Sequence, residues 1–430
     1  MRNFLVDPEF YKNNRKHITE KQAAKSISVI NSNYQMPTNA DGSMPFVQNS
    51  DIFYLTGINQ EDTTLLLFPD APNEKFKEIL FIRYADEHVL TWEGHKLSKE
   101  QARDVSGIET VVWHSEFERV FKSLVYDADI IYINSNEHRR ADNIVKNRDD
   151  VFLTWCKEHF PLHEYKRLAP ILLNLRSIKY EAEIKQIEKA CSITKSGFER
   201  AAKFLKPGVF EYELEAEFSH EFIKNGSKGF AYQPIIASGA DSCVLHYISN
   251  HKQCLYGEIV LLDVAAEYNN YKSDLTRVLP VNGKFTNRQK DVYNAVLRMM
   301  RYAITLLKPG TDFEEYTKLV GQKAEEELLL IGILKSEEVA KQLENQPLYR
   351  KYFMHGVSHF LGLDVHDVGI MRGMMKPGML LTCEPGLYLK EEGIGIRLEN
   401  NILITDSGNI DLMANIPVEI EEIEDLMLNV

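Results

Sequence analysis

The stretch Leu205-Lys206-Pro207-Gly208 recurs later in the chain as Leu307-Lys308-Pro309-Gly310. Each copy ends a run with helical periodicity, because proline lacks a backbone donor and glycine readily takes the left-handed conformation that closes a helix. An acidic helical segment follows each copy, and each half then has an apolar strand that begins after a glycine and ends in a carboxylate. This repeated order favours an internal duplication, in which two similar halves bring their acids to a shared seam.

The chain before the first of these helices has a different pattern. Residues 1–172 have short β-rich runs between polar helical stretches, which predicts a mixed α/β domain. The predicted strands are Phe53–Leu55, Thr64–Phe68, Ile79–Tyr84 and Ile130–Ile133. The segment Phe160–Leu173 contains two prolines and is the best candidate for a linker. We therefore expect two domains, 1–172 and 173–430, in a protein of the α/β (α+β) class.

The composition limits the partners and the compartment. The chain has 430 residues and a formal net charge of −13, with no basic tract, so we expect neither nucleic acid nor an anionic membrane as a partner. The five cysteines form no C-x-x-C pair, which argues against a disulfide framework and a zinc ribbon. The first ten residues lack the apolar stretch of a signal peptide. We expect a cytoplasmic protein.

Two aspartates in the first half can share one side of a hairpin. Asp263 lies in the apolar strand Ile259–Ala266, where an unpaired carboxylate would cost several kcal/mol unless it were paired or bound to a metal. The pair Asn269-Asn270 is a turn signal, after which Asp274 lies in a returning extended segment. If the connection has an even number of residues, Asp263 and Asp274 point to the same side.

The second half repeats this arrangement with glutamates. Glu384 follows the apolar residues Leu380–Cys383, and Glu399 lies in the strand-like segment Ile394–Ile404. Four carboxylates at one seam would repel each other, and Arg397 is the clearest nearby cation. Divalent cations are the physical solution to this repulsion.

Three of the 13 histidines, His355, His359 and His366, fall within one short segment between the acid strands. A His-x-x-x-His spacing can put two imidazoles on one face of a helix, but Gly356 stands where a metalloprotease helix needs glutamate. His246 is a further candidate. Four carboxylates and an imidazole suit a dinuclear site for Mn²⁺, Co²⁺ or Zn²⁺, which would generate hydroxide near neutral pH and polarise a carbonyl. The chain contains no P-loop, G-x-S-x-G or G-x-G-x-x-G motif.

These acids and histidines occur in a recognisable context. The segments LLDVAAEY, YKSDLTRVLPVNGKFT, HGVSHFLGLDVHDVG, LLTCEPGLY and GIGIRLENNILIT resemble the metal-ligand motifs of the Xaa-Pro aminopeptidases (aminopeptidase P), in the pita-bread metallopeptidase family M24. The N-terminal stretch MPFVQNSDIFYLTGI resembles the non-catalytic domain of that family. The resemblance implies a C-terminal pita-bread fold with a pseudo-twofold duplication and a smaller N-terminal mixed α/β domain.

The resemblance also implies roles for individual residues. Two divalent ions, with Mn²⁺ expected first, would be held with Asp263 on one ion, Asp274 and Glu399 bridging, and His359 and Glu384 on the other. Glu384 would accept and donate the proton of a hydroxide nucleophile, and His366 would stabilise the oxyanion. The substrate pocket would be lined by His246, His355, His366, Tyr388 and Arg397, with His246 and His355 also counted as catalytic.

The implied activity is cleavage of peptides with proline in second position, by a homodimer or a homotetramer. An Xaa-Pro dipeptidase (prolidase) shares the fold and the ligands, but GIGIRLENNILIT and the ending PVEIEEIEDLM resemble the aminopeptidase more closely. A catalytically silent binding module of this fold is the more distant alternative. The intact set of five ligands argues against it.

Overall fold

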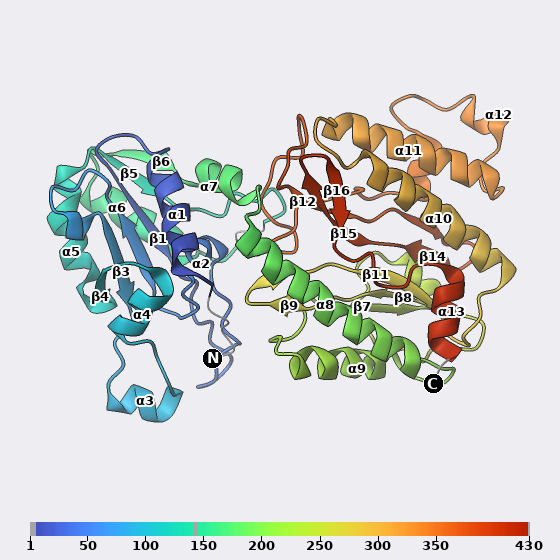
Figure 1. Cartoon of the computed structure of the whole chain (residues 1–430), viewed down its shortest axis with the longest axis horizontal. Coiled ribbons are helices and arrows are strands. Elements are labelled where there is room, and N and C mark those ends of the chain that lie inside the picture. Colours follow the sequence, from blue (N-terminus) through green and yellow to red (C-terminus); the bar gives the residue numbers. More distant parts are fainter. Residues whose placement is uncertain (1–5, 142–143, 429–430) are drawn as a thin grey trace. The chain divides into compact units, whose positions relative to one another are not determined.

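The computed structural model describes residues 6–141 and 144–428 (Figure 1). The chain divides into two compact units, one that ends at Leu175 and one that starts at Arg176. The segment predicted as a linker, Phe160–Leu173, instead has regular secondary structure. It contains strand β6 (Glu164–Arg167) and the beginning of helix α7 (Ala169–Arg176). One of its prolines lies in the first turn of α7, where its missing N–H has no partner to lose.

The N-terminal unit is built on a six-stranded mixed sheet in the order β4-β3-β2-β1-β5-β6. Its other strands are β1 (Ser26–Asn31), β2 (Thr64–Leu67), β3 (Glu78–Ile82), β4 (Thr110–Trp113) and β5 (Ile130–Ile133). Its other helices are α1 (Pro8–Thr19), α2 (Ser50–Thr56), α3 (Glu87–Glu93), α4 (Lys99–Ser106), α5 (Phe117–Leu124) and α6 (Arg148–His159), with short 3₁₀ turns η1 (Glu74–Phe76), η2 (His114–Glu116) and η3 (Val125–Asp127). Every side chain of β1 is buried, as expected for a central strand.

Three of the four strands predicted in this unit are confirmed, as β2, β3 and β5. The fourth prediction is wrong, because Phe53–Leu55 lies inside α2. Asn49 caps this helix by accepting from the N–H groups of Asp51 and Ile52, and Gly57 ends it with a φ of 68°. A short buried apolar run fits a helix as well as a strand, so the capping residues decide between them.

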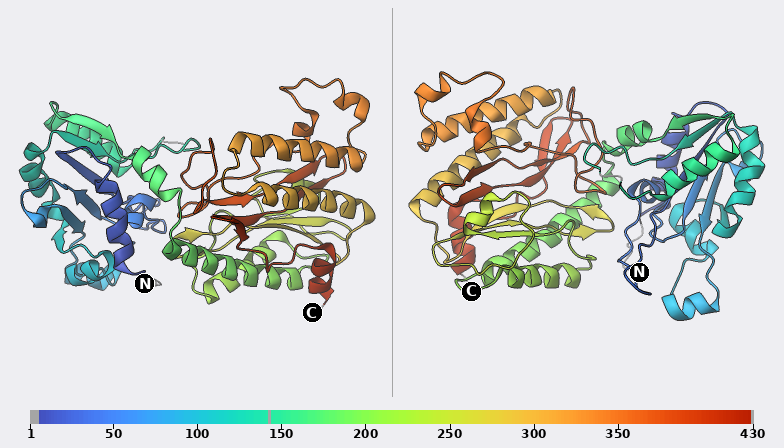
Figure 2. Two further views of the ribbon diagram at one scale, coloured as in Figure 1. Left: turned by 45° about the horizontal axis from the view of Figure 1, so that its top comes forward. Right: turned by 180° about the vertical axis from the view of Figure 1, so that it is seen from behind.

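The second unit has two helix pairs on opposite sides of its strands, as the views in Figures 1 and 2 show. Its helices are α8 (Glu181–Phe204), α9 (Glu211–Lys224), α10 (Asn287–Leu306), α11 (Phe313–Leu330), α12 (Ser336–Val339) and α13 (Ile420–Leu428), with 3₁₀ turns η4 (Gly239–Cys243) and η5 (Leu348–Lys351). Its first strands are β7 (Ile235–Ser238), β8 (Ile259–Asp263), β9 (Glu267–Tyr268), β10 (Tyr271–Lys272) and β11 (Thr276–Pro280). Its later strands are β12 (Leu380–Cys383), β13 (Gly386–Leu389), β14 (Ile394–Arg397), β15 (Asn400–Thr405) and β16 (Gly408–Asp411).

Both halves of this unit have the element order that the sequence predicts. Each has two helices, a three-stranded antiparallel sheet (β11-β8-β7 or β12-β15-β16) and a two-stranded hairpin (β9-β10 or β13-β14). The helices α8 and α10 end just before the repeated Lys-Pro-Gly segments, and Gly208 and Gly310 have φ values of 98° and 82°. Only glycine takes this left-handed conformation at little cost, so the repeated stop signal has the same physical basis in both halves.

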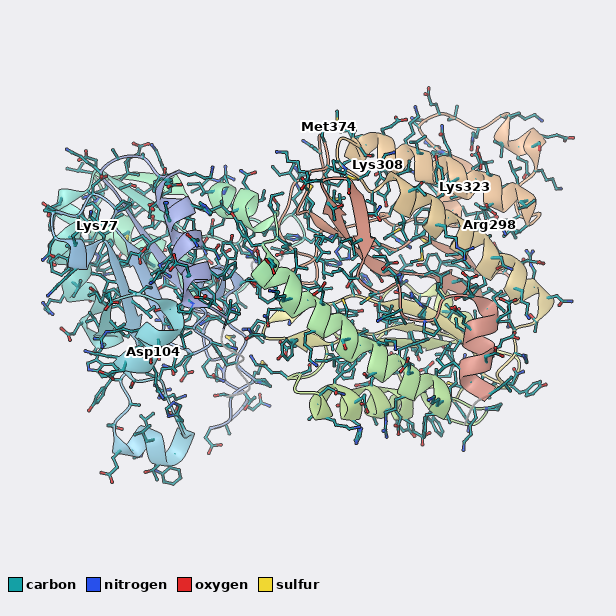
Figure 3. All side chains as sticks on the ribbon, viewed as in Figure 1. Lys77, Asp104, Arg298, Lys308, Lys323 and Met374 are labelled. Carbon is teal, nitrogen blue, oxygen red and sulfur yellow. The ribbon has the colours of Figure 1, made fainter. Side chains whose placement is uncertain are left out.

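A buried glutamate fastens the second helix pair. Glu327 of α11 accepts from Nε of Arg298 on α10 at 2.9 Å, and its other oxygen lies 3.0 Å from Nζ of Lys323. Figure 3 labels Arg298 and Lys323 on these two helices. These cations lower the pKa of Glu327 although burial acts to raise it, so the carboxylate stays charged while it holds the helices together.

None of the helices in the described ranges combines the length and the apolar character that crossing a bilayer demands.

Candidate metal centre

The four predicted acids lie where each half passes from its three-stranded sheet into its hairpin. In the first half, Asp263 ends β8 and pairs with Thr276 of β11. Asp274 lies two residues before Thr276, and the hairpin β9-β10 continues the same register through the pair Tyr268 and Tyr271. Residues two apart on a strand share a face, so Asp263 and Asp274 project from the same side.

The second half has the same construction. β12 and β15 pair Cys383 with Asn400, and β13 and β14 pair Gly386 with Arg397. Both pairs belong to one register, which places Glu384 opposite Glu399. In each half the two acids therefore lie on one face of the strands, as the period of two in the sequence predicts.

Buried polar contacts join the two halves at this seam. The side chain of Asn401 donates to the carbonyl of Asp274 at 2.6 Å and accepts from the N–H of Asp274 at 3.1 Å. The guanidinium of Arg277 is fully buried and donates to the carbonyl of Glu399 at 2.8 Å. A backbone bond from the N–H of Glu399 to the carbonyl of Thr276 completes the seam. The acids of the two halves are thus held against each other by the chain itself.

The segment that carries His359 is extended, so His355 and His359 do not share a helical face, which agrees with the rejection of the metalloprotease helix motif. The N–H of Thr382 donates to the carbonyl of His359, and the N–H of Glu384 donates to the carbonyl of Val357. Phe360 forms an antiparallel bridge with Leu381. The segment therefore lies along β12 as an additional strand-like edge, which brings His359 beside the carboxylates.

Three of the predicted ligands form one tight group. Asp274, His359 and Glu399 each offer a ligand atom, and these atoms all lie within 4.8 Å of one another. Nε2 of His359 lies 3.4 Å from Asp274 and 3.5 Å from Glu384. Nδ1 of His359 bonds the carbonyl of Phe360 at 2.9 Å, so this nitrogen carries a proton and Nε2 is the nitrogen that faces the acids and could bind a cation.

The charges and an unpaired oxygen at this site fit a divalent cation. Within the described residues, Oε1 of Glu399 is buried and has no hydrogen-bond partner. Burial, together with the charges of Asp274 and Glu384, raises the pKa of Glu399 well above its usual value. Burial also raises the pKa of Glu384 to about 7, against the opposing charge of His359. A cation would relieve both the repulsion and the unsatisfied oxygen, so the donor set fits a metal.

Asp263 stands slightly apart from the group of three. Its Oδ1 accepts from the hydroxyl of Tyr232 and its Oδ2 accepts from Arg397, both at 2.6 Å. Burial raises the pKa of Asp263, whereas Arg397 opposes this shift. Each oxygen keeps a further lone pair, so these bonds orient the carboxylate and leave it able to bind a cation.

A chain of hydrogen bonds continues from Asp263 to His355. Arg397 also donates to the hydroxyl of Tyr388, which lies 2.8 Å from Nε2 of His355. Nδ1 of His355 bonds the carbonyl of Gly356 and therefore carries the proton, so Tyr388 donates to Nε2. Burial and the charge of Arg397 lower the pKa of His355 to about 4, so this imidazole is neutral at pH 7.

The remaining predicted histidines lie at the edge of the site. The ring of His366 packs edge to face against His359, with the centroids 4.5 Å apart. His246 is exposed in the loop after η4 and contributes to the lowered pKa of His355. The structure thus brings all the predicted histidines to one neighbourhood.

Two further residues contact the acids and were missed in the sequence. Thr276 donates to Oε2 of Glu399 at 2.7 Å and accepts from Nε of Arg397 at 3.1 Å. Its position two residues after Asp274 was the signal that could have found it. Tyr232 has no such signal, because it reaches Asp263 from outside any quoted motif.

A buried ion cluster was also missed, although one member ends the histidine segment. The carboxylate of Asp367 binds Arg176 and, at 2.9 Å, Nζ of Lys179, and all three side chains are buried. The N–H of Asp367 donates to the carbonyl of Phe360, which is also the acceptor for His359. This cluster therefore anchors the loop between His359 and His366.

The profile of metallopeptidase family M24 matches residues 185–406, and that of the aminopeptidase P N-terminal domain matches residues 11–132. The chain is 34% identical over 436 residues to the Xaa-Pro aminopeptidase of Escherichia coli (strain K12), covering 98% of both chains. It is 31% identical to human Xaa-Pro aminopeptidase 3, covering 89% of this chain and 76% of the relative.

Solved structures agree with these matches. Aminopeptidase P from E. coli with the inhibitor Pro-Leu has a TM-score of 0.88 at 34% identity, covering 99% of both chains. Proline aminopeptidase P II from Yersinia pestis has a TM-score of 0.88 at 34% identity, covering 98% of this chain and all of that one. The fold, the seam of acids and these matches together establish that the chain belongs to metallopeptidase family M24.

Proposed function

We propose that this enzyme is an Xaa-Pro aminopeptidase, which hydrolyses the bond between a first residue and a proline in second position. The observation that carries the proposal is the close grouping of Asp274, His359 and Glu399 at the seam, with Glu384 3.5 Å from His359. Within the described part of the chain, one oxygen of Glu399 in this group has no hydrogen-bond partner. The choice of substrate is supported by the relatives named Xaa-Pro aminopeptidase, which match the chain over nearly its whole length.

The metal content that we propose is two divalent ions, with Mn²⁺ first and Co²⁺ or Zn²⁺ as alternatives. Asp263 would hold one ion, Asp274 and Glu399 would bridge the two, and His359 and Glu384 would complete the second. Carboxylate-rich sites with one imidazole suit hard or borderline ions of this kind. When bound, such ions supply a nucleophile at neutral pH by lowering the pKa of water, and they polarise the scissile carbonyl.

Two side chains would handle the proton and the developing charge. Among the acids, Glu384 has the most exposed side chain at 18%, compared with 13% for Asp263 and 7% for Asp274. This exposure favours Glu384 as the acid that meets substrate and water, and it would accept the proton and pass it to the leaving nitrogen. His366, beside His359, would hydrogen-bond the carbonyl oxygen as it becomes negative.

The remaining residues would place the substrate. Its free amine would approach Asp263, and the exposed His246 and neutral His355 would contact the peptide at the entrance. Tyr388 and Arg397 are buried and hydrogen-bonded to His355 and Asp263, so they would support the pocket from behind. A proline in second position has a fixed φ and no N–H, which excludes it from most peptidase sites and makes a dedicated pocket necessary.

The compartment and the assembly complete the proposal. The five cysteines are free and buried, which suits a reducing cytoplasm. The resemblance to aminopeptidase P supports a homodimer or a homotetramer, to be read from sedimentation velocity.

The test is a side-by-side assay of Xaa-Pro-Xaa tripeptides, matched Xaa-Ala-Xaa tripeptides and Xaa-Pro dipeptides, each with Mn²⁺ and with chelator. We expect turnover of the proline tripeptide alone, and only with metal. Turnover limited to the dipeptide would assign the chain as a prolidase. Full activity after exhaustive chelation would refute the metal mechanism.

A further inference from the structure

Glu211 is a fully buried carboxylate outside the metal centre. It is the first residue of α9, and among the described residues the four hydrogen bonds to its side chain all come from the stretch 238–252. Oε1 accepts from the N–H of Ser238 at 2.8 Å and from its hydroxyl at 2.7 Å. Oε2 accepts from the hydroxyl of Tyr247 and from the N–H of Lys252, both at 2.9 Å. Buried ionised groups persist only when they are satisfied in this way.

These partners enclose the loop that presents His246. Ser238 ends β7 before the loop and Lys252 follows it, so the two ends of the loop meet at one carboxylate. Tyr247 is the neighbour of His246 in the sequence, which gives the carboxylate a third hold in the middle of the loop. The backbone N–H of Glu211 also donates to the carbonyl of Lys252. The loop is therefore closed at its base and fixed beside its exposed histidine.

The loop is also seated against the strand that carries Arg397. The N–H of Gly395 in β14 donates to the hydroxyl of Ser242 at 2.8 Å. A Cβ at Gly395 would lie 2.1 Å from the carbonyl oxygen of Ser242, so this approach requires glycine. The loop is thus attached to the strand of the site as well as to Glu211, and Asn250 near its end adds hydrogen bonds to Ile236 and Pro234.

We propose that Glu211 is a positioning residue for His246, which holds the loop 239–251 so that this histidine stands at the entrance of the site. The inference rests on the role proposed above for His246. Glu211 contacts neither the acids nor His359 in the bonds described, and it acts through the loop alone.

The hydrogen bonds explain why glutamine cannot replace this glutamate. Each carboxylate oxygen accepts from one backbone N–H, Oε1 from Ser238 and Oε2 from Lys252. In either orientation, the amide NH₂ of glutamine would face one of these fixed N–H donors. Glu211→Gln therefore keeps the shape of the side chain while it breaks one end of the loop. Tyr247→Phe is the milder variant, because it removes one hydroxyl and keeps the ring.

The experiment is a double-mutant cycle in the Mn²⁺-loaded enzyme with a proline tripeptide. We expect His246→Ala to raise KM, and Glu211→Gln to lower kcat/KM by about tenfold, mainly through KM, as for the loss of a buried hydrogen bond. Glu211→Gln should have no further effect on kcat/KM in the His246→Ala background. Mn²⁺ affinity, measured by calorimetry, should be unchanged in both single variants.

Three results would overturn the inference. The first is a wild-type kcat/KM for Glu211→Gln while the kcat/KM of His246→Ala is lowered. This result would refute the positioning role and leave the proposed function intact. The second is a Glu211→Gln loss that multiplies with that of His246→Ala, because it would show independent action. The third is wild-type kinetics for His246→Ala. If Glu211→Gln does not fold, Tyr247→Phe replaces it in the same cycle. We expect Tyr247→Phe to raise KM by a smaller factor. A Tyr247→Phe effect that persists in the His246→Ala background would refute the inference.

Discussion

Removal of metal should make the stability of the second unit fall as pH rises, and Glu384 should cause much of this fall. Burial raises the pKa of this carboxyl to about 7 in the metal-free protein, from an ordinary value of 4.5. Because the folded-state pKa is the higher one, the contribution of this carboxyl to stability is fully present below about pH 4.5 and is lost as the pH rises through 7. The difference corresponds to roughly 3 kcal/mol at alkaline pH, or about 10 °C in Tm for a unit of this size.

Calorimetric melting at pH 5 and pH 8.5 tests this reasoning, on chelator-treated wild type, Glu384→Gln and a control, Glu315→Gln. Glu315 is an exposed glutamate of α11, so its variant should follow the wild type. We expect the metal-free wild type to lose about 10 °C more than Glu384→Gln between the two pH values. Reloading with Mn²⁺ should reduce the loss in the wild type. Equal losses in wild type and Glu384→Gln, without metal, would refute the argument.

Three other variants test separate parts of the structure. Glu384→Gln in the Mn²⁺-loaded enzyme should lower kcat by about 10³-fold with an unchanged circular dichroism spectrum, and a near wild-type rate would refute its role in proton transfer. Gly362→Ala places a Cβ 2.1 Å from Oδ2 of Asp367 and should cost about 2 kcal/mol in urea unfolding. Gly356→Ala, whose nearest neighbour is 3.9 Å away, is the control, and equal stabilities would count against the clash. Burial raises the pKa of Asp149 to about 8, so its contribution to stability is lost as the pH rises to that value. In urea unfolding, the free energy of unfolding of Asp149→Asn should therefore increase relative to that of the wild type between pH 4 and pH 8. Parallel pH profiles of the two proteins would contradict this.

The sequence predicts the metal seam well because the periodicity of strands is strict. Once Asp263 and Asp274 were placed on one hairpin, and Glu384 and Glu399 on the other, a period of two fixed their faces. The same rule was available for Thr276. The repeated Lys-Pro-Gly segments predicted the order of elements because their effect is also local. The proline and the glycine of each segment end the preceding helix through their own backbone conformations.

The missed features depend on contacts between distant parts of the chain. Arg176 and Asp367 are 191 positions apart, and Tyr232 reaches Asp263 from a segment without a motif. No local pattern encodes such pairs. The error at Phe53–Leu55 has a different cause, because three apolar residues fit a strand or a helix and the cap at Asn49 settles the choice.

The seam between the halves makes the metal site a product of their assembly. Each half contributes two of the four carboxylates, and Arg277 and Asn401 hold the first half against the second through buried hydrogen bonds. A chain cut between β11 and α10 would therefore give two fragments, each with an incomplete set of ligands. Tight metal binding would appear only on mixing, so a metal titration would measure fragment complementation and report how strongly two duplicated halves still depend on each other.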